Sequence, residues 1–222
     1  MSALSCFAHL GRNTKAVSDP ENLAGDVPSR FFVFMGVCGA GKSTIAEAVA
    51  SAISGDFLDA DDLHPAANVA AMSEGRPLGD ADRWPWLEAV CAAALTVDPA
   101  RPVAIACSAL MRRYRDFMRA RLSAAVFIHL HGSPVLIRER MTHRRSHFMS
   151  PAMLESQLAA LEPPDDEPGC HNLNVDGPQD AVIAQAISIC RRHIAATQQG
   201  APKASTESKT KPERLQRRKG NA

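Results

Sequence analysis

The chain has 222 residues and a formal net charge of +1, with 25 Lys and Arg against 24 Asp and Glu. Hydrophobic residues make up 45% and charged residues 22%, which is typical of a globular protein and argues against a disordered or fibrous one. No apolar run approaches the roughly 18 residues that a membrane-spanning helix needs, so we expect no membrane insertion. The length suits one α/β domain of ordinary size.

Residues 1–29 are polar and interrupted by Pro and Gly, and we expect them to form a disordered leader. Their start lacks the basic and long apolar segments of a secretory signal, although Arg12 and Lys15 leave an organelle transit peptide as a weaker alternative. The six cysteines include no Cys-x-x-Cys pair. Free thiols in a reducing compartment are therefore favoured, and we expect a cytoplasmic protein.

A predicted buried strand at 31–35 leads directly into Gly36-Val-Cys-Gly-Ala-Gly-Lys-Ser43, and a predicted helix at 43–54 follows. Gly, four residues and Gly-Lys-Ser between a strand and a helix form the pattern of a phosphate-binding loop. The glycines let backbone N–H groups turn toward phosphate oxygens, and the helix N-terminus adds partial positive charge. In this setting Lys42 reaches the β- and γ-phosphates, and the Ser43 hydroxyl ligates Mg²⁺.

Strands and helices alternate along the rest of the sequence, which predicts an α/β fold with three layers. We expect a parallel sheet of about five strands with helices on both faces, formed by residues 30–196. Ligands of such sheets bind beyond the carboxyl ends of the strands, where Asp59, Ser108 and Asp176 fall. The predicted strands are 31–35, 56–59, 103–107, 125–130 and 172–176, and the predicted helices are 43–54, 84–96, 110–121, 133–143, 150–161 and 178–195.

Two aspartates, Asp59 and Asp61, follow the second predicted strand. Phosphoryl transfer needs one carboxylate to orient Mg²⁺ and another to accept the proton of the acceptor hydroxyl. The alternative is an acidic loop before a helix, with Asp61 or Asp62 as its cap.

The C-terminal residues 197–222 carry seven Lys and Arg against Glu207 and Glu213, a net charge of +5. They contain almost no apolar residues, so we expect a disordered basic tail. Nucleic acid is a possible partner for such a tail, but a solvated extension is the favoured interpretation.

The sequence as a whole resembles the gluconokinases, small P-loop kinases that phosphorylate D-gluconate. Leu63-His64-Pro65 and Cys107-Ser108-Ala109-Leu110 are the most specific motifs of this resemblance. The segments that carry it lie at 36–44, 57–65, 75–87, 107–116, 140–144, 147–149 and 156–163, with Asn68 and Met72 between them.

The resemblance implies a fold like that of shikimate kinase and the nucleoside monophosphate kinases, with a helical lid and a homodimer. It also implies that ATP and Mg²⁺ are used to convert D-gluconate to 6-phosphogluconate. Asp61 would be the general base and Asp59 would lie near the metal with Ser43. Lid arginines Arg140 and Arg144 would cover the transferred phosphate. The nucleotide-binding residues would be Gly36, Val37, Cys38, Gly39, Ala40, Gly41, Lys42, Ser43 and Thr44.

Gluconate is a linear polyol with a carboxylate, so its site needs one or two cations and several hydrogen-bonding groups. Besides Asp61, the candidate substrate ligands are His64, Arg83, Arg112, Arg115 and His147. The alternative for each arginine is a surface ion pair, such as Arg115 with Asp116 or Arg83 with Asp80.

The chain departs from the usual family pattern at three positions. Ala60 replaces a glycine between the aspartates, at a cost of about 1 kcal/mol if that position needs positive φ. Met111 replaces a lysine, and a neighbouring residue such as Arg112 faces about 100° away on a helix. Ser146 replaces a lid glycine. The alternatives are therefore a kinase of the same fold for another small acceptor, or a non-catalytic nucleotide-binding protein that uses its tail.

Overall fold

The structure is a computed structural model that describes residues 29–142 and 151–199. Nearly all of the predicted leader and of the predicted basic tail lies outside these residues, as do Arg144, Ser146 and His147. Among the helices that the structure describes, none combines the length and the apolar character needed to cross a membrane.

The sheet has five parallel strands in the order β2-β3-β1-β4-β5. In the central strand, Phe32 lies beside Ala104 on one side and Val126 on the other. The α/β prediction is confirmed, and each predicted strand agrees with the structure to within two residues. The strands are β1 (Phe31–Met35), β2 (Asp56–Asp59), β3 (Val103–Ala106), β4 (Val126–His131) and β5 (Cys170–Asn174).

Seven α-helices and one 3₁₀ helix lie within the described residues: α1 (Lys42–Ala52), η1 (Ala60–Leu63), α2 (Ala66–Ser73), α3 (Asp80–Thr96), α4 (Arg112–Arg121), α5 (Pro134–Thr142), α6 (Pro151–Ala160) and α7 (Gln179–Gln199). Helix α2 was not predicted. Helix α3 begins four residues before the predicted start, because the Asp82 carboxylate accepts the Gly79 N–H at 2.9 Å and caps an earlier turn. Helix α7 continues past the predicted domain end at residue 196.

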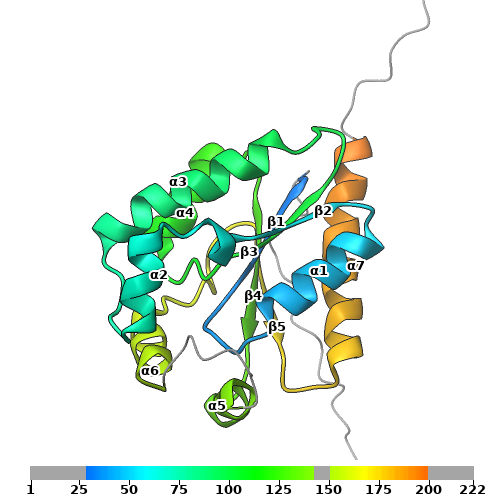
Figure 1. Ribbon diagram of the computed structural model, residues 1–222. Coiled ribbons are helices and arrows are strands. Elements are labelled where there is room, and N and C mark those ends of the chain that lie inside the picture. The colour runs from blue at the N-terminus through cyan, green and yellow to red at the C-terminus, as the bar shows by residue number, and fades with distance from the viewer. Residues whose placement is uncertain (1–28, 143–150, 200–222) are drawn as a thin grey trace, which may run out of the picture.

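The side chains of β1 alternate between two hydrophobic layers, as the period of a strand requires. Phe31, Val33 and Met35 pack with α3 and α4, whereas Phe32 and Phe34 pack with α1 and α7. Figure 1 shows these two helix pairs on opposite sides of the sheet. Strands β1 and β3 are consequently buried at every residue, which explains their continuous apolar sequences.

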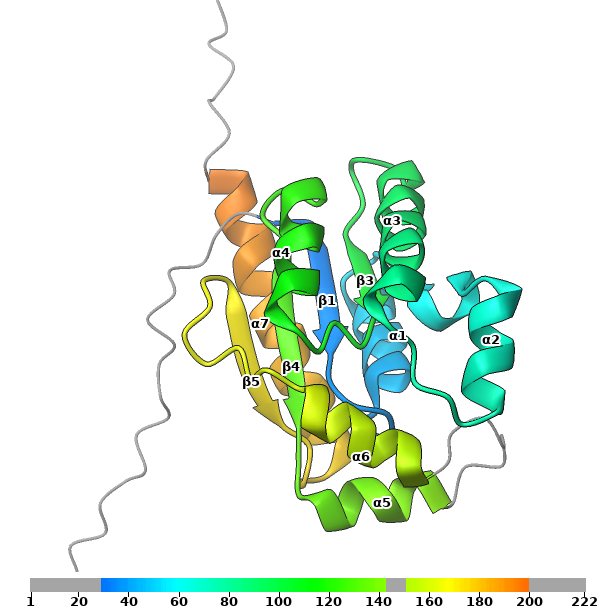
Figure 2. The same ribbon diagram turned by 90° about the vertical axis from the view of Figure 1, so that its left-hand side faces the viewer.

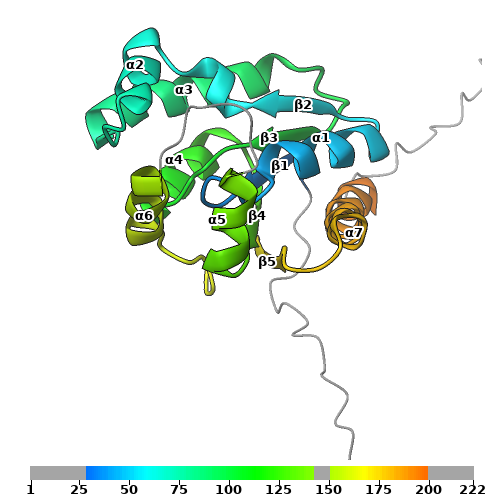
Figure 3. The same cartoon turned by 60° about the horizontal axis from the view of Figure 1, so that its bottom comes forward.

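Helices α5 and α6 lie at the end of the sheet toward which the strands point (Figure 2). Figure 3, in which this end comes forward, shows α5 beside the start of α1, with α6 on the other side of α5. A small hydrophobic cluster joins them to the phosphate loop, with Val37 and Cys38 packed against Ile137 of α5 and Leu154 of α6. The carboxyl ends of the strands therefore face a space bordered by α5, α6 and the loop.

Candidate active site

The loop after β1 has the backbone of a phosphate-binding loop. Gly36, Gly39 and Gly41 have φ angles of 135°, 83° and 93°, which side-chain-bearing residues rarely adopt. A Cβ atom at Gly36 would lie 2.5 Å from the Leu130 carbonyl oxygen. Gly41 is the N-cap of α1 and supplies no side-chain cap, so this helix N-terminus is suited to an anion.

Lys42 is the first residue of α1, and its Nζ donates to the Val37 carbonyl oxygen at 3.1 Å. The ammonium group is thereby held across the loop. This position agrees with its predicted contact with phosphate.

One pocket brings together Lys42, Asp61, His64 and Arg83, which come from three separate segments of the chain: the start of α1, the segment of η1 and its C-cap, and α3. Cys38, Gly39, Gly41 and Ser43 from the phosphate loop line it too. The other lining residues were not predicted as site residues: Met72, Leu78, Trp86, Ser108, Met153 and Gln157.

The acidic segment at the end of β2 is organised by Asp59. Its Oδ1 accepts the Asp61 N–H at 3.0 Å and caps η1, so the cap is Asp59 and not Asp61 or Asp62. The Asp61 side chain remains 58% exposed beside the phosphate loop. A carboxylate in this position is accessible to an acceptor hydroxyl.

Ala60 is fully buried, and its carbonyl oxygen accepts the Trp86 indole N–H at 2.7 Å. It is not among the described residues with positive φ. The substitution of the family's glycine therefore carries no left-handed backbone penalty here.

His64 stacks on Trp86, with ring centroids 4.2 Å apart and planes 12° apart. Its Nε2 lies 4.0 Å from Asp61 Oδ1, and its Nδ1 lies 3.4 Å from the Asn68 amide nitrogen. Burial lowers the pKa of His64, and this effect outweighs the opposing effect of Asp61, while Arg83 lowers the pKa further. A neutral ring near pH 7 offers one donor and one acceptor to a polar ligand.

Arg83 is held by Tyr114, whose hydroxyl accepts from Nη1 at 3.2 Å. The Tyr114 hydroxyl in turn donates to Asp80 Oδ1 at 2.5 Å, and Arg113 binds the same oxygen at 2.8 Å. The hydrogen bond from Arg113, followed by that from Tyr114, lowers the pKa of Asp80. Arg83 therefore lines the pocket with its guanidinium held by the Tyr114 hydroxyl. Its hydrogen-bond partner is Tyr114 and not Asp80, the ion-pair partner that was the alternative.

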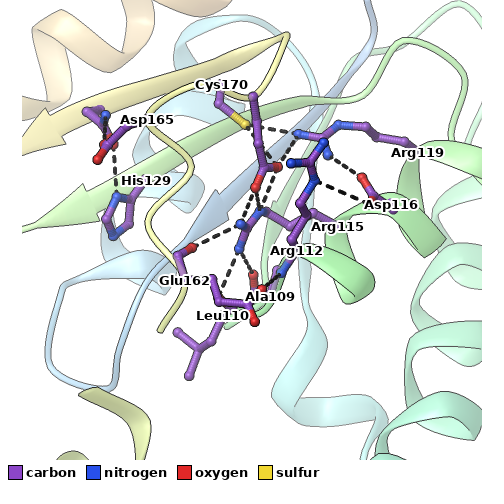
Figure 4. A network of polar contacts seen from close by, with 12 residues as sticks. Ala109, Leu110, Arg112, Arg115, Asp116, Arg119, His129, Glu162, Asp165 and Cys170 are labelled. Carbon is purple, nitrogen blue, oxygen red and sulfur yellow. Dashed lines mark hydrogen bonds and ion pairs between the residues drawn. The ribbon is translucent and has the colours of Figure 1, made fainter. Parts of the chain in front are cut away.

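Arg115 does not reach the pocket, which corrects its predicted role as a substrate ligand. Its side chain is fully buried and forms an ion pair with Glu167, with Nε–Oε2 at 2.9 Å. One N–H group of Nη2 donates to Glu167 Oε1, and the other three N–H groups donate to the carbonyl oxygens of Ala109, Leu110 and Glu162, each at 2.9 Å (Figure 4). All five guanidinium N–H groups are thus used within the protein.

Arg112 does not replace the cation missing at Met111. Its side chain is 66% exposed and pairs with Asp116 at 3.7 Å. Met111 is the N-cap of α4 and packs against the core on the α3 side. Among the residues that the structure describes, Arg83 is consequently the arginine that lines the pocket with Lys42.

A second pocket lies on the other side of the phosphate loop, lined by Gly39, Gly41, Thr44, Ile45, Arg140, Val175, Gln179 and Val182. Arg140 donates to the Val175 carbonyl oxygen at 2.8 Å. The structure thus places this predicted catalytic arginine beside the loop but apart from the pocket that contains Asp61. Because Gly39 and Gly41 border both pockets, a nucleotide on the loop would contact each.

Asp59 and Ser43, the predicted metal ligands, lie at the end of β2 and the start of α1. No group of three or more His, Cys, Asp and Glu side chains in the described part of the chain is arranged to hold a metal. A hydroxyl and a carboxylate still match the oxygen ligands of Mg²⁺, which commonly takes only one or two protein ligands beside phosphates and waters.

Comparison with known proteins identifies the family, although no protein-family model matches the sequence. The chain is 39% identical over 163 residues to the thermoresistant gluconokinase of Escherichia coli strain K12, covering 72% of this chain and 93% of the relative. It is 37% identical over 171 residues to a probable gluconokinase of Schizosaccharomyces pombe, covering 73% and 89%.

Comparison with solved structures supports the same family. A gluconokinase from Sinorhizobium meliloti 1021 superposes with a TM-score of 0.62 at 40% identity, covering 78% of this chain and 93% of that one. A shikimate kinase from Bacteroides thetaiotaomicron, at 16% identity and a TM-score of 0.51, shows the shared fold alone. From its sequence, its phosphate loop and these relatives, the chain belongs to the gluconokinase family of P-loop kinases.

Proposed function

We propose that this protein transfers the γ-phosphoryl group of ATP to the primary hydroxyl of D-gluconate, giving 6-phosphogluconate and ADP. The observation that carries the proposal is the pocket in which Lys42 of the phosphate loop meets Asp61, His64 and Arg83. It joins a nucleotide-phosphate site to a carboxylate and to cationic and neutral hydrogen-bonding groups. The names and similarity of the relatives support the same substrate.

In this proposal the triphosphate binds the backbone N–H groups of the loop from Gly36 to Thr44. Lys42 balances the charge that develops on the transferred phosphoryl group. Ser43 and Asp59 would hold Mg²⁺ through their oxygens, and the ion would supply charge neutralisation to the β- and γ-phosphates. The nucleoside extends toward the second pocket, beside Thr44 and Val182.

Asp61 accepts the proton of the attacking hydroxyl. The hydroxyl oxygen bonds to the γ-phosphorus, the bond from that phosphorus to the β–γ bridging oxygen breaks, and ADP leaves. The exposure of the Asp61 carboxylate allows it to meet a hydroxyl directly. The Arg83 guanidinium binds the gluconate carboxylate. Neutral His64 exchanges hydrogen bonds with the hydroxyl chain.

Arg140 and Arg144 belong to a lid in this proposal and cover the transferred phosphate once both substrates are bound, whereas His147 is a ligand of the substrate. Closure would exclude water, so that transfer to the sugar acid outcompetes hydrolysis. We further propose a cytoplasmic homodimer whose kinase domain spans about residues 30–196, flanked by a disordered leader and a solvated basic tail. Nucleic acid is not required as a partner.

The test is ADP formation by the purified chain with ATP and Mg²⁺ across gluconate, shikimate, other sugar acids, AMP and no acceptor. Of these acceptors, we expect only gluconate to give strong turnover, and we expect ³¹P NMR to identify the product as 6-phosphogluconate. Lys42→Met is the control, because it removes the cation from the phosphate loop and should abolish turnover. Turnover with a different acceptor would reassign the substrate, and ATP binding without turnover on any acceptor would indicate a non-catalytic relative.

A further inference from the structure

Gln157, on helix α6, makes a contact with the phosphate loop that no assigned role explains. Its Oε1 accepts the backbone N–H of Cys38 at 2.6 Å, although 119 residues separate the two in sequence. A backbone N–H can only donate, so the oxygen of the amide must face the loop and the Nε2 group must be turned away from it. No hydrogen bond from Nε2 is found within the described parts of the chain.

The position of α6 is fixed on both sides of this residue. Leu154 is 1% exposed and packs against Val37 and Leu110, with Leu158 one turn further along the same face. Beyond the helix, the Glu162 N–H donates to the Leu110 carbonyl oxygen at 2.9 Å. Gln157 is thus presented by a packed helix, which holds a donor in place at little entropic cost.

Gln157 and Met153, one turn apart, line the same pocket as Asp61, His64 and Arg83. The charged groups of that pocket suit phosphate and carboxylate. A chain of hydroxyl groups also needs neutral donors, because a site built to hydrogen-bond hydroxyls discriminates against analogues that lack them. Gln157 is the amide side chain among the described residues that line this pocket.

We propose that Gln157 is a specificity-determining residue, whose Nε2 donates a hydrogen bond to a hydroxyl of the sugar-acid acceptor while its Oε1 fixes it to the phosphate loop through Cys38. The proposal rests on the proposed function, since it assumes a polyhydroxy acid in this pocket. It links recognition of the acceptor to the loop that holds the nucleotide.

The test compares steady-state kinetics of the full chain with Gln157→Leu and Gln157→Glu. Leucine removes both contacts, and we expect KM for the sugar acid to rise about tenfold, the worth of one hydrogen bond of about 1.4 kcal/mol, with the Kd for ATP unchanged. Glutamate keeps an oxygen for the Cys38 N–H but loses the donor and adds a negative charge beside an anionic substrate. Gln157→Glu should therefore fold like the wild type and lose at least as much affinity for the acceptor.

Gln185→Leu is the matched control, because Gln185 is exposed on α7 and lines neither pocket described above; it should leave all constants unchanged. Wild-type behaviour of Gln157→Glu would overturn the proposal, since the Cys38 contact alone would then suffice. Tighter ATP binding by Gln157→Leu with an unchanged acceptor KM would also overturn it, because Gln157 would merely occupy the loop until phosphate arrives. If the wild-type protein did not phosphorylate gluconate, that result would contradict the proposed function instead. The variants would then be compared on whichever acceptor of the assay panel the wild type does phosphorylate.

Discussion

Arg115 and Glu167 form a buried ion pair that ties helix α4 to the segment before β5. The Glu167 carboxylate also binds Arg119 at 2.8 Å, and both partners of the main pair are at most 5% exposed. Arg115 extends the connection to the carbonyl oxygens of Ala109 and Leu110. Those residues follow Ser108, whose carbonyl oxygen accepts the Gly36 N–H at 3.2 Å. The pair thus supports the loop that borders the phosphate site (Figure 4).

Glu167→Gln should lower the free energy of unfolding by about 3 kcal/mol, because it leaves a buried guanidinium without its counter-charge. Burial alone would raise the pKa of Glu167, but hydrogen bonds from Arg115 and Arg119 outweigh it and hold the pKa below its ordinary value. The wild type should therefore also lose stability as the pH falls through this lowered pKa. Urea unfolding of both proteins measures the effect.

The matched control is Glu74→Gln, which breaks the exposed pair between Arg76 and Glu74, both about two-thirds exposed. It should change the free energy of unfolding by less than about 0.5 kcal/mol. If the two substitutions changed the free energy of unfolding equally, burial of the pair between Arg115 and Glu167 would contribute nothing to stability.

Local sequence patterns were enough to predict much of this fold. The period-2 burial of β1, the glycine loop and the helical spacing of α1 are properties of adjacent residues. Helix α2 was not predicted although Pro65 precedes it and alanines fill it, because its buried residues, Asn68 and Ala71, give it no apolar face that a periodic pattern could reveal.

Only those parts of the site that lie within recognisable sequence motifs were predicted. Lys42, Asp61, His64 and Arg83 do meet in one pocket. Arg115 was misjudged because its partner Glu167 lies 52 residues away, and no local rule predicts that pairing. Gln157 was seen as part of a motif, but its contact with Cys38 depends on how α6 packs, which sequence spacing does not specify.

Tyr114→Phe should raise KM for gluconate roughly threefold to tenfold with little change in kcat. The ring remains, so its edge contact with Trp84 and its contact with the Arg83 guanidinium are preserved. Only the hydroxyl that joins Arg83 to Asp80 is lost. Initial rates at varied gluconate, with ATP saturating, give the two constants.

The accompanying experiment is a double-mutant cycle with Arg83→Ala. If Tyr114 acts by orienting Arg83, Tyr114→Phe should have no further effect once that guanidinium is absent. A Tyr114→Phe penalty of the same size in both backgrounds would show that the tyrosine acts independently of Arg83.

Asp61→Asn should reduce kcat by about a hundredfold or more while ATP remains bound, because the amide accepts no proton from the attacking hydroxyl. Single-turnover phosphoryl transfer and ATP binding measured on the same preparation separate chemistry from affinity. Asp62→Asn is the matched control, since Asp62 is exposed and does not line the pocket. Unchanged kcat in Asp61→Asn would remove the general-base assignment.

His129 should contribute to loss of stability in acid. Its ring is buried beside Asn172, whose Oδ1 lies 2.9 Å from Nδ1. Burial lowers the pKa of His129, which the contact with Asn172 opposes only in part, and nearby His131 and Arg115 lower it further. Between the ordinary histidine pKa of about 6.5 and this lowered value, the unfolded chain binds a proton that the folded chain does not. The free energy of unfolding therefore decreases as the pH is lowered through that window. Below the window it no longer depends on the titration of His129.

His129→Gln removes this titration while keeping a hydrogen-bonding side chain. The difference in free energy of unfolding between about pH 7.5 and about pH 5.5 should be smaller in the variant than in the wild type. Urea denaturation at both pH values measures this difference directly, so any uniform loss of packing in the variant cancels. An identical pH dependence in the two proteins would mean that His129 binds its proton equally in the folded and unfolded chains, and that burial beside Asn172 imposes no cost on its charged form.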